Sequence, residues 1–206
     1  DSNAQTVGHG LGVAPDVIIL KSRTAGSNWR VWHKSIATDG SKRLILDSNN
    51  QSEDASFLND TAPTSTIFTL GNSDNAWNAS GNTYISYLFS EVAGYSKFGK
   101  YTGNGSSDGT FVFTGFRPAW IMIKRTDSTN DWHINDYKRD IDNTVIEYLY
   151  ANTSAAQNNL SSGGGLDFLS NGFKIRNTSA AVINGNGADY IYLAFAEAPF
   201  KNARAR

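Results

Sequence analysis

The chain has 206 residues, a formal net charge of −1 and no cysteine. A charge so close to zero gives no electrostatic basis for binding nucleic acid or inserting at an anionic membrane. The lack of cysteine excludes disulfides and thiolate metal sites, and no apolar run approaches the roughly 20 residues of a membrane span. The polar residues 1–6 contain no signal-peptide core, so we expect the chain to be a segment of a longer protein.

The first half predicts a series of short β-strands in a turn-rich chain. Successive side chains of a strand point to opposite faces, so residues of one parity (every second residue) share a face. Residues 17–20 are apolar on both parities, which predicts a central strand covered on both faces. Alternating residues 29–34 follow a polar turn and predict a hairpin partner for that strand. Further strands are predicted at residues 6–9, 42–46, 66–70 and 84–92.

The second half repeats the first. Gly12, Pro15, Lys21 and Trp29 each recur 103 positions later, as Gly115, Pro118, Lys124 and Trp132 (118 − 15 = 103). Residues 142–150 fit either a short helix or a strand.

The repeat predicts an all-β protein made of two tandem lectin-like or jelly-roll-like β-sandwich repeats of about 100 residues each. The two repeats form either separate sandwiches or one pseudo-twofold unit. We place them at residues 1–98 and 99–206, the second ending in a polar, frayed tail at 201–206.

Comparison of the two copies selects candidate ligand-binding residues. Trp29 and Val31 match Trp132 and Ile134, so this parity is expected to face inward. Arg30 and Trp32 then lie on the opposite face, where Trp32 stands level with an asparagine in the second copy. Trp32 either packs under a neighbouring loop or against the other copy, or offers a flat platform for a sugar ring.

Two further aromatic residues complete the candidate set. Tyr137 lies on the same face of the second copy as Trp32 does in the first, and Trp77 lies between two polar turns. The candidate ligand-binding residues are Trp32, Tyr137, Arg30 and Trp77.

The acidic residues give little support to catalysis. Glu91 and Glu197 recur once per copy, as structural residues would, whereas glycosidases need two carboxyl groups across one bond. We expect each glutamate to pair with the lysine of its own copy, Lys21 or Lys124, since an unpaired buried carboxylate is costly. The sequence therefore predicts no catalytic residues and no enzyme.

No cofactor or metal site is predicted. His9, His33 and His133 lack metal-ligand spacing, and His33 is expected to be a solvated strand residue. The oxygen-rich loops at residues 47–50 and 72–75 are better explained as solvated loops than as calcium sites.

Several segments resemble a family of bacteriophage virion proteins found in tail fibres, which has no assigned activity. The second copy carries this resemblance through Trp132 and through YTGNGSSDG (101–109), GFRPAWIMIKR (115–125), SNGFKI (170–175) and YIYLAF (190–195). The first copy carries it through HGLGVAPDVIILK (9–21) and NTYISYLF (82–89). These motifs are glycines, a proline and core aromatics, so the resemblance supplies no site residues.

The resemblance implies a virion tail appendage that acts outside the cell, with other virion subunits as partners and a homo-oligomer as one arrangement. Three functions stay open at this point: a non-enzymatic domain that binds host-surface carbohydrate, a purely structural spacer or oligomerisation domain, and a polysaccharide-cleaving enzyme. Stacking aromatic rings together with Asn, Asp and Arg hydrogen bonds from loops would serve the first.

Overall fold

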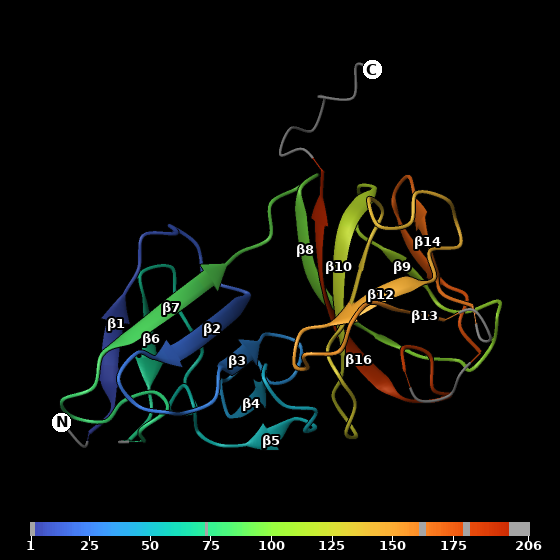
Figure 1. Cartoon of the computed structure of the whole chain (residues 1–206). Coiled ribbons are helices and arrows are strands. Elements are labelled where there is room, and N and C mark those ends of the chain that lie inside the picture. The colour runs from blue at the N-terminus through green and yellow to red at the C-terminus, as the bar shows by residue number, and fades with distance from the viewer. Residues whose placement is uncertain (1–2, 73, 161–163, 179–181, 198–206) are drawn as a thin grey trace. The chain divides into compact units, whose positions relative to one another are not determined.

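The computed structural model describes residues 3–72, 74–160, 164–178 and 182–197. These residues form β-strands, turns and loops and contain no helix (Figure 1). The predicted all-β class is therefore confirmed, and the segment at residues 142–150 contributes a strand rather than a helix. The predicted polar tail at residues 201–206 lies outside the described residues.

The chain divides into two compact units, Asp1–Ser90 (unit 1) and Glu91–Arg206 (unit 2). Each unit contains one larger and one smaller antiparallel sheet, as in a β-sandwich. The division falls before the boundary at 98/99 that the sequence suggested, because the strand at residues 96–102 pairs entirely within unit 2.

Unit 1 is built around its central strand β2. β2 lies between β3 and β7 (Figure 1), and Val17, Ile18 and Leu20 are each at most 1% exposed, as apolar residues on both parities require. The larger sheet has the order β5-β4-β3-β2-β7, and β1 pairs with β6 in the smaller one. The strands are β1 (Gln5–Gly8), β2 (Val17–Ser22), β3 (Arg30–His33), β4 (Lys42–Ile45), β5 (Glu53–Asp54), β6 (Ile67–Leu70) and β7 (Tyr84–Phe89).

Unit 2 has the same plan with additional strands. Its larger sheet has the order β13-β12-β11-β10-β16-β8, and its smaller sheet the order β14-β15-β9. The strands are β8 (Ser96–Thr102), β9 (Phe111–Phe113), β10 (Pro118–Arg125), β11 (His133–Asp136), β12 (Glu147–Tyr150), β13 (Asn158–Asn159), β14 (Leu166–Leu169), β15 (Gly172–Ile175) and β16 (Asp189–Ala196).

The larger sheets of the two units have matching strand orders. β5-β4-β3-β2-β7 corresponds to β13-β12-β11-β10-β16, after which unit 2 alone adds β8. The registers match as well, since Lys21 lies opposite Ile85 and Lys124 lies opposite Ile191. The tandem repeat stays a prediction, and these equal orders and registers support it.

A tyrosine ties the closing strand of each unit to the loop before it. The hydroxyl of Tyr84 accepts a hydrogen bond from the backbone N–H of Ala79, and the hydroxyl of Tyr190 accepts one from Gly185, both at 2.8 Å. We call these two hydrogen bonds the tyrosine latches.

An asparagine supports each tyrosine latch. Asn78 donates to the carbonyl of Gly71 at 2.8 Å, and Asn184 donates to the carbonyl of Asn177 at 2.7 Å. Each asparagine directly precedes the residue whose N–H meets the tyrosine, so the two loops are held in the same way.

The inward parity agrees with the sequence prediction only in part, because Val31 and Trp132 are buried as expected. Trp32, rather than Trp29, packs in the core of unit 1, and His133 and Asn135 are the buried residues of β11. In the closing strand, Ile85 and Tyr87 are 39% and 45% exposed. β3 and β16 are covered on both faces, since Val31 and Trp32 are both buried, as are Tyr190 and Ile191. The alternation of side chains therefore does not single out one inward face in these strands.

The predicted glutamate–lysine pairs are also wrong. Glu91 binds Lys97 at 2.8 Å, and Glu197 binds Lys138 at 3.3 Å. Lys21 lies opposite Ile85 and Lys124 opposite Ile191, and each glutamate lies six residues further along the chain. Each carboxylate is therefore separated from the predicted lysine by roughly 15–20 Å along the strand.

His33 and His133 are buried, at 0% and 1% exposure, and not solvated. Burial lowers the pKa of His133 to about 4, although a hydrogen bond with Asn135 acts in the opposite direction. The Nδ1 atom of His133 lies 2.9 Å from Oδ1 of Asn135, and the ring stacks on Tyr148 at 4.2 Å.

The buried His133 makes the stability of unit 2 depend on pH. An unfolded histidine has a pKa near 6.5, so between pH 6.5 and 4 the unfolded state binds more protons than the folded state. The His133 contribution is therefore complete above pH 6.5 and declines as the pH falls. Between pH 7 and 4.5 we expect the free energy of unfolding to fall by about 2–3 kcal/mol from this residue.

Urea unfolding of the wild type and of His133→Gln at both pH values tests this expectation. The variant is less stable at pH 7 but loses about 2–3 kcal/mol less than the wild type on acidification. Equal losses in the two proteins would contradict the assignment.

Candidate functional site

Trp32 is part of the core of unit 1. Its side chain is 2% exposed, and its indole N–H donates to the carbonyl of Ala37 at 2.8 Å. A buried ring has no free face, so Trp32 cannot be the sugar-stacking platform that the sequence suggested. The alternative, packing inside the fold, is the one the structure bears out.

The structure brings Trp77 and Arg30 together in unit 1. The guanidinium of Arg30 lies 5.8 Å from the centre of the Trp77 ring, and that of Arg43 lies 4.8 Å from it. Burial, followed by the nearby charge of Arg43, lowers the pKa of Arg30. Trp77 is 6% exposed, so its ring is not open to solvent. The two cations stabilise the packing of the loop that carries Trp77.

Tyr137 belongs to unit 2 and is half-buried. The ammonium of Lys138 lies 4.7 Å from its ring centre, and the guanidinium of Arg117 lies 6.0 Å away. Cations therefore already lie against this ring. Tyr137 and the group formed by Trp77 and Arg30 do not share a site within either unit.

A cavity of about 480 Å³ lies within unit 1. Its apolar wall comes from β1, β2 and β6, and its polar wall from the loop at residues 77–82 and from β7. The lining residues are Gln5, Val7, Leu20, Phe68, Leu70, Trp77, Asn78, Ala79, Ser80, Gly81, Asn82, Tyr84 and Ser86. Trp77 is thus the one sequence-predicted residue that lines a cavity described in the structure.

Unit 2 carries two exposed phenylalanines side by side on β9. Phe111 is 45% and Phe113 is 61% exposed, whereas Val112 between them is buried. A Cβ atom added to Gly172, on the neighbouring strand β15, would lie 3.2 Å from the ring of Phe111. One side of the Phe111 ring therefore lies over a glycine.

The same surface continues across the three-stranded sheet. The register pairs Phe111 with Lys174 and Lys174 with Asp167, so these side chains share the outer face. We call this surface the aromatic face; it comprises Phe111, Phe113, Asp167, Leu169, Gly172 and Lys174.

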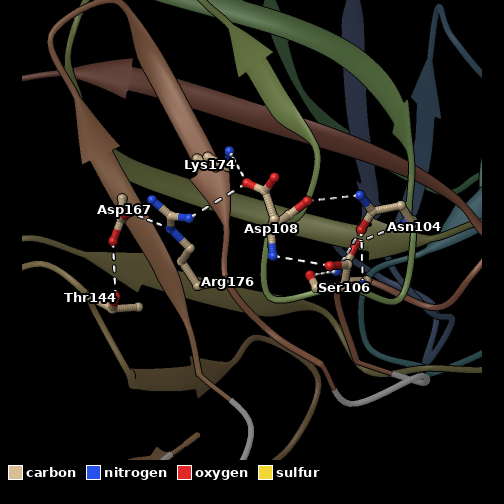
Figure 2. Close-up of polar contacts among 8 residues, drawn as sticks. Asn104, Ser106, Asp108, Thr144, Asp167, Lys174 and Arg176 are labelled. Atoms are coloured by element: carbon tan, nitrogen blue, oxygen red, sulfur yellow. Dashed lines mark hydrogen bonds and ion pairs between the residues drawn. The ribbon is translucent and has the colours of Figure 1, made fainter.

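A charged network borders the aromatic face. Figure 2 shows Asp108 facing Lys174 and Arg176, with which it forms ion pairs. The hydrogen bond from Lys174 lowers the pKa of Asp108. Arg176 also donates from Nε to Asp167 at 2.7 Å, and Thr144 donates to the other oxygen of Asp167 at 2.9 Å.

The loop that carries Asp108 is ordered by side-chain hydrogen bonds. Asn104 donates to the carbonyl of Asp108, and Ser106 accepts from its N–H, both at 3.1 Å (Figure 2). The Asp108 side chain in the Lys174 pair is 82% exposed, so this network meets solvent beside the phenylalanine rings. Carboxylate, ammonium, guanidinium and aromatic groups thus converge on one small sheet.

Among the described residues, no group of three or more histidine, cysteine, aspartate or glutamate side chains could hold a metal ion. Within the same ranges, no helix is long and apolar enough to cross a membrane.

A family model described as a domain of unknown function (DUF7483) matches residues 1–199. The chain belongs to this family. Neither the curated proteins nor the solved structures yielded a match. The DUF7483 match spans both units, so the family domain comprises the pair rather than one unit.

Sequence reasoning missed the aromatic face of the DUF7483 domain. The run Phe111-Val112-Phe113 is apolar at every position, so the sequence does not show which parity is outside. One signal was available in the sequence: the offset of 105 that relates Phe68 to Phe173 also puts Thr6 level with Phe111 and Gly8 level with Phe113. The strand registers agree with this match. Unit 1 has no aromatic residue at these two positions, which points away from a role for Phe111 and Phe113 in a core that the two units would share.

Because Trp32 is a core residue, its loss should affect stability. We expect Trp32→Ala to lower the free energy of unfolding of unit 1 by about 3–5 kcal/mol, the usual cost of truncating a buried aromatic side chain. Urea unfolding monitored by circular dichroism measures this loss. Phe113→Ala is the matched control, with an expected change within about 0.5 kcal/mol. A loss below about 1 kcal/mol for Trp32→Ala would contradict the core assignment.

Proposed function

We propose that this DUF7483 domain is a non-enzymatic part of a bacteriophage tail appendage and binds host-surface carbohydrate through the aromatic face of unit 2. The observation that supports the binding role is the pair of exposed rings, Phe111 and Phe113, beside a charged hydrogen-bonding network. The tail-appendage role is supported by the resemblance of both halves of the sequence to virion proteins.

The chemistry of the aromatic face suits a sugar. The apolar face of a pyranose ring covers an exposed aromatic ring and removes apolar surface from water. Its hydroxyl groups both donate and accept hydrogen bonds, and Asp108, Lys174 and Arg176 offer acceptors and donors at the edge of the face. The Asp108 loop is already ordered by Asn104 and Ser106, so binding would require little further ordering.

The proposed setting is the outside of the cell. There the chain would be held by other virion subunits, with a homo-oligomer as one arrangement, while the aromatic face meets the host surface. The proposal requires no catalytic residue, since recognition needs only the rings and the charged network.

A purely structural spacer or oligomerisation domain is the second candidate. It is favoured by the burial of Trp32, which leaves no open ring face, and by the half-buried ring of Tyr137, against which Lys138 already lies. On this alternative the aromatic face would lie against another virion subunit instead of a glycan.

A glycan array and a host-cell binding assay with the full chain distinguish the two candidates. We expect Phe111→Ala and Phe113→Ala each to weaken glycan binding by about 5- to 30-fold, because each removes a stacking ring worth about 1–2 kcal/mol. Tyr87→Ala is the matched control, because it removes an aromatic ring of similar exposure from unit 1.

Equal binding by the wild type and both phenylalanine variants would place any glycan site elsewhere. No binding to any glycan or host cell would favour the spacer.

A further inference from the structure

The outer edge of β7 in unit 1 has no paired strand among the described residues. The carbonyls of Thr83 and Phe89 accept hydrogen bonds from the backbone N–H groups of Arg23 and Asp16, which flank β2. In β7 the backbone groups of this parity therefore face β2. The backbone N–H and C=O groups of Tyr84, Ser86 and Leu88 therefore point away from β2, toward the free edge.

Free edges of this kind are normally protected against pairing with other chains. Charged residues, proline and bulges are the usual devices. The sequence of β7 is YISYLF, with no charge and no proline, and its pairing with β2 shows no bulge. The strand is thus suited to accept a further strand.

In unit 2 the corresponding edge is occupied. β8 pairs antiparallel with β16 along its whole length, from Asp189 opposite Thr102 to Phe195 opposite Ser96 (Figure 1). Tyr84, Ser86 and Leu88 of β7 correspond to Tyr190, Tyr192 and Ala194 of β16. The three residues with outward-pointing backbone groups in unit 1 are therefore the ones that β8 pairs in unit 2.

Of the two buried aromatic residues of β8, Phe98 and Tyr101, it is Tyr101 that packs in the hydrophobic core of unit 2. The ring of Tyr101 stacks on Tyr190 at 5.0 Å and meets Phe173 edge-on at 6.2 Å. Its hydroxyl donates to the carbonyl of Ile183 at 2.7 Å. Tyr101 is thereby 7% exposed and belongs to the core.

The three residues around Tyr101 have counterparts in unit 1. Tyr190 corresponds to Tyr84 through the tyrosine latch, and Ile183 corresponds to Trp77, because each directly precedes the asparagine of that loop. Phe173 corresponds to Phe68 through the pairing with Val112 and Val7.

All three counterparts line the 480 Å³ cavity of unit 1. The cavity therefore lies where unit 2 holds the ring of Tyr101.

We propose that the free edge of β7 and the adjoining cavity form one acceptor site for an extended polypeptide segment outside these 206 residues. The segment adds antiparallel to β7, as β8 does to β16, and inserts an aromatic side chain into the cavity. Backbone hydrogen bonds to Tyr84, Ser86 and Leu88 supply affinity, and the aromatic side chain supplies specificity and register. This inference is independent of the proposed carbohydrate function.

One difference between the units makes the register testable. In unit 2, a Cβ atom added to Gly99 would lie 2.7 Å from the hydroxyl of Tyr192, so only glycine fits there. The counterpart of Tyr192 in unit 1 is Ser86, which is much smaller. The segment that binds β7 can therefore carry a larger residue two positions before its aromatic residue.

A fluorescein-labelled synthetic peptide of residues 94–105 is the probe, titrated into the full chain and followed by fluorescence anisotropy. β8 itself is tethered at both ends and competes for β16 at high effective concentration, so the free peptide is directed to β7. Amide hydrogen exchange of the complex should show new protection at Tyr84, Ser86 and Leu88.

Two peptide variants and two protein variants test the two parts of the site. We expect a Tyr101→Ala peptide to bind at least tenfold more weakly. Ser86→Pro in the protein should weaken binding to the same degree, because it removes an outward N–H while proline is tolerated on an edge strand. Ser86→Tyr should accept the wild-type peptide but reject a Gly99→Ala peptide, whereas wild-type protein binds both.

A fusion provides a second measurement that does not depend on affinity. When residues 94–105 are joined directly before Asp1, the added tyrosine lies as many residues before Val7 as Tyr101 lies before Val112. The added segment should therefore reach β7 and protect its outward amides from exchange. Equal binding of the Tyr101→Ala peptide, or no added protection in the fusion, would overturn the proposal. A dimer of the chain paired through β7 that excludes the peptide would also overturn it, with a second copy as the occupant.

Discussion

The tyrosine latches are the interactions on which the rest of each unit depends. A buried hydroxyl and a buried backbone N–H, such as those of Tyr190 and Gly185 in unit 2, must each find a partner, since leaving either unpaired costs about 1–3 kcal/mol. The corresponding hydrogen bond of unit 1 is partly buried. In each unit one hydrogen bond satisfies both groups and fixes a loop against the closing strand. In unit 1 that loop and that strand form one wall of the cavity, so the tyrosine latch also sets the shape of the acceptor site.

The two units use this common plan differently. Unit 2 closes the edge of its larger sheet with β8 and fills its interior with Tyr101, while its smaller sheet exposes Phe111 and Phe113. Unit 1 has Thr6 and Gly8 in place of those phenylalanines, and its β7 edge and cavity are open. The two proposals follow from these differences: a ligand on the smaller sheet of unit 2, and a polypeptide strand on the larger sheet of unit 1.

The sequence predicted the strands more accurately than the faces they present. The apolar run at residues 17–20 identified the central strand correctly, because only a strand covered on both faces needs apolar residues on both parities. The orientation of Trp32 was hidden because Arg30 and Lys34 made its face look polar, whereas Val31, Trp32 and His33 are all buried in the structure. The Glu–Lys pairs failed because matching offsets show which residues correspond but not how far apart they lie along a strand.

The candidate sites were less accessible to sequence reasoning. Trp77 was selected as an aromatic residue, and it does line the cavity. The cavity itself lies where unit 2 has the strand β8, which has no counterpart among the described residues of unit 1. Such a site is visible only when the pairing of β16 with β8 is set beside the single pairing of β7. The aromatic face was likewise hidden, because Phe111 and Phe113 become a surface only once Val112 is known to face inward.

The central claim is that unit 1 is open at the edge that unit 2 closes, and residue-resolved amide hydrogen exchange of the full chain tests it most directly. The account predicts that the amides of Tyr84, Ser86 and Leu88 exchange at least about 100-fold faster than those of Tyr190, Tyr192 and Ala194. It also predicts that the amides of Ile85 and Tyr87, which face β2, are protected. Equal protection of the outward amides in β7 and β16 would contradict it.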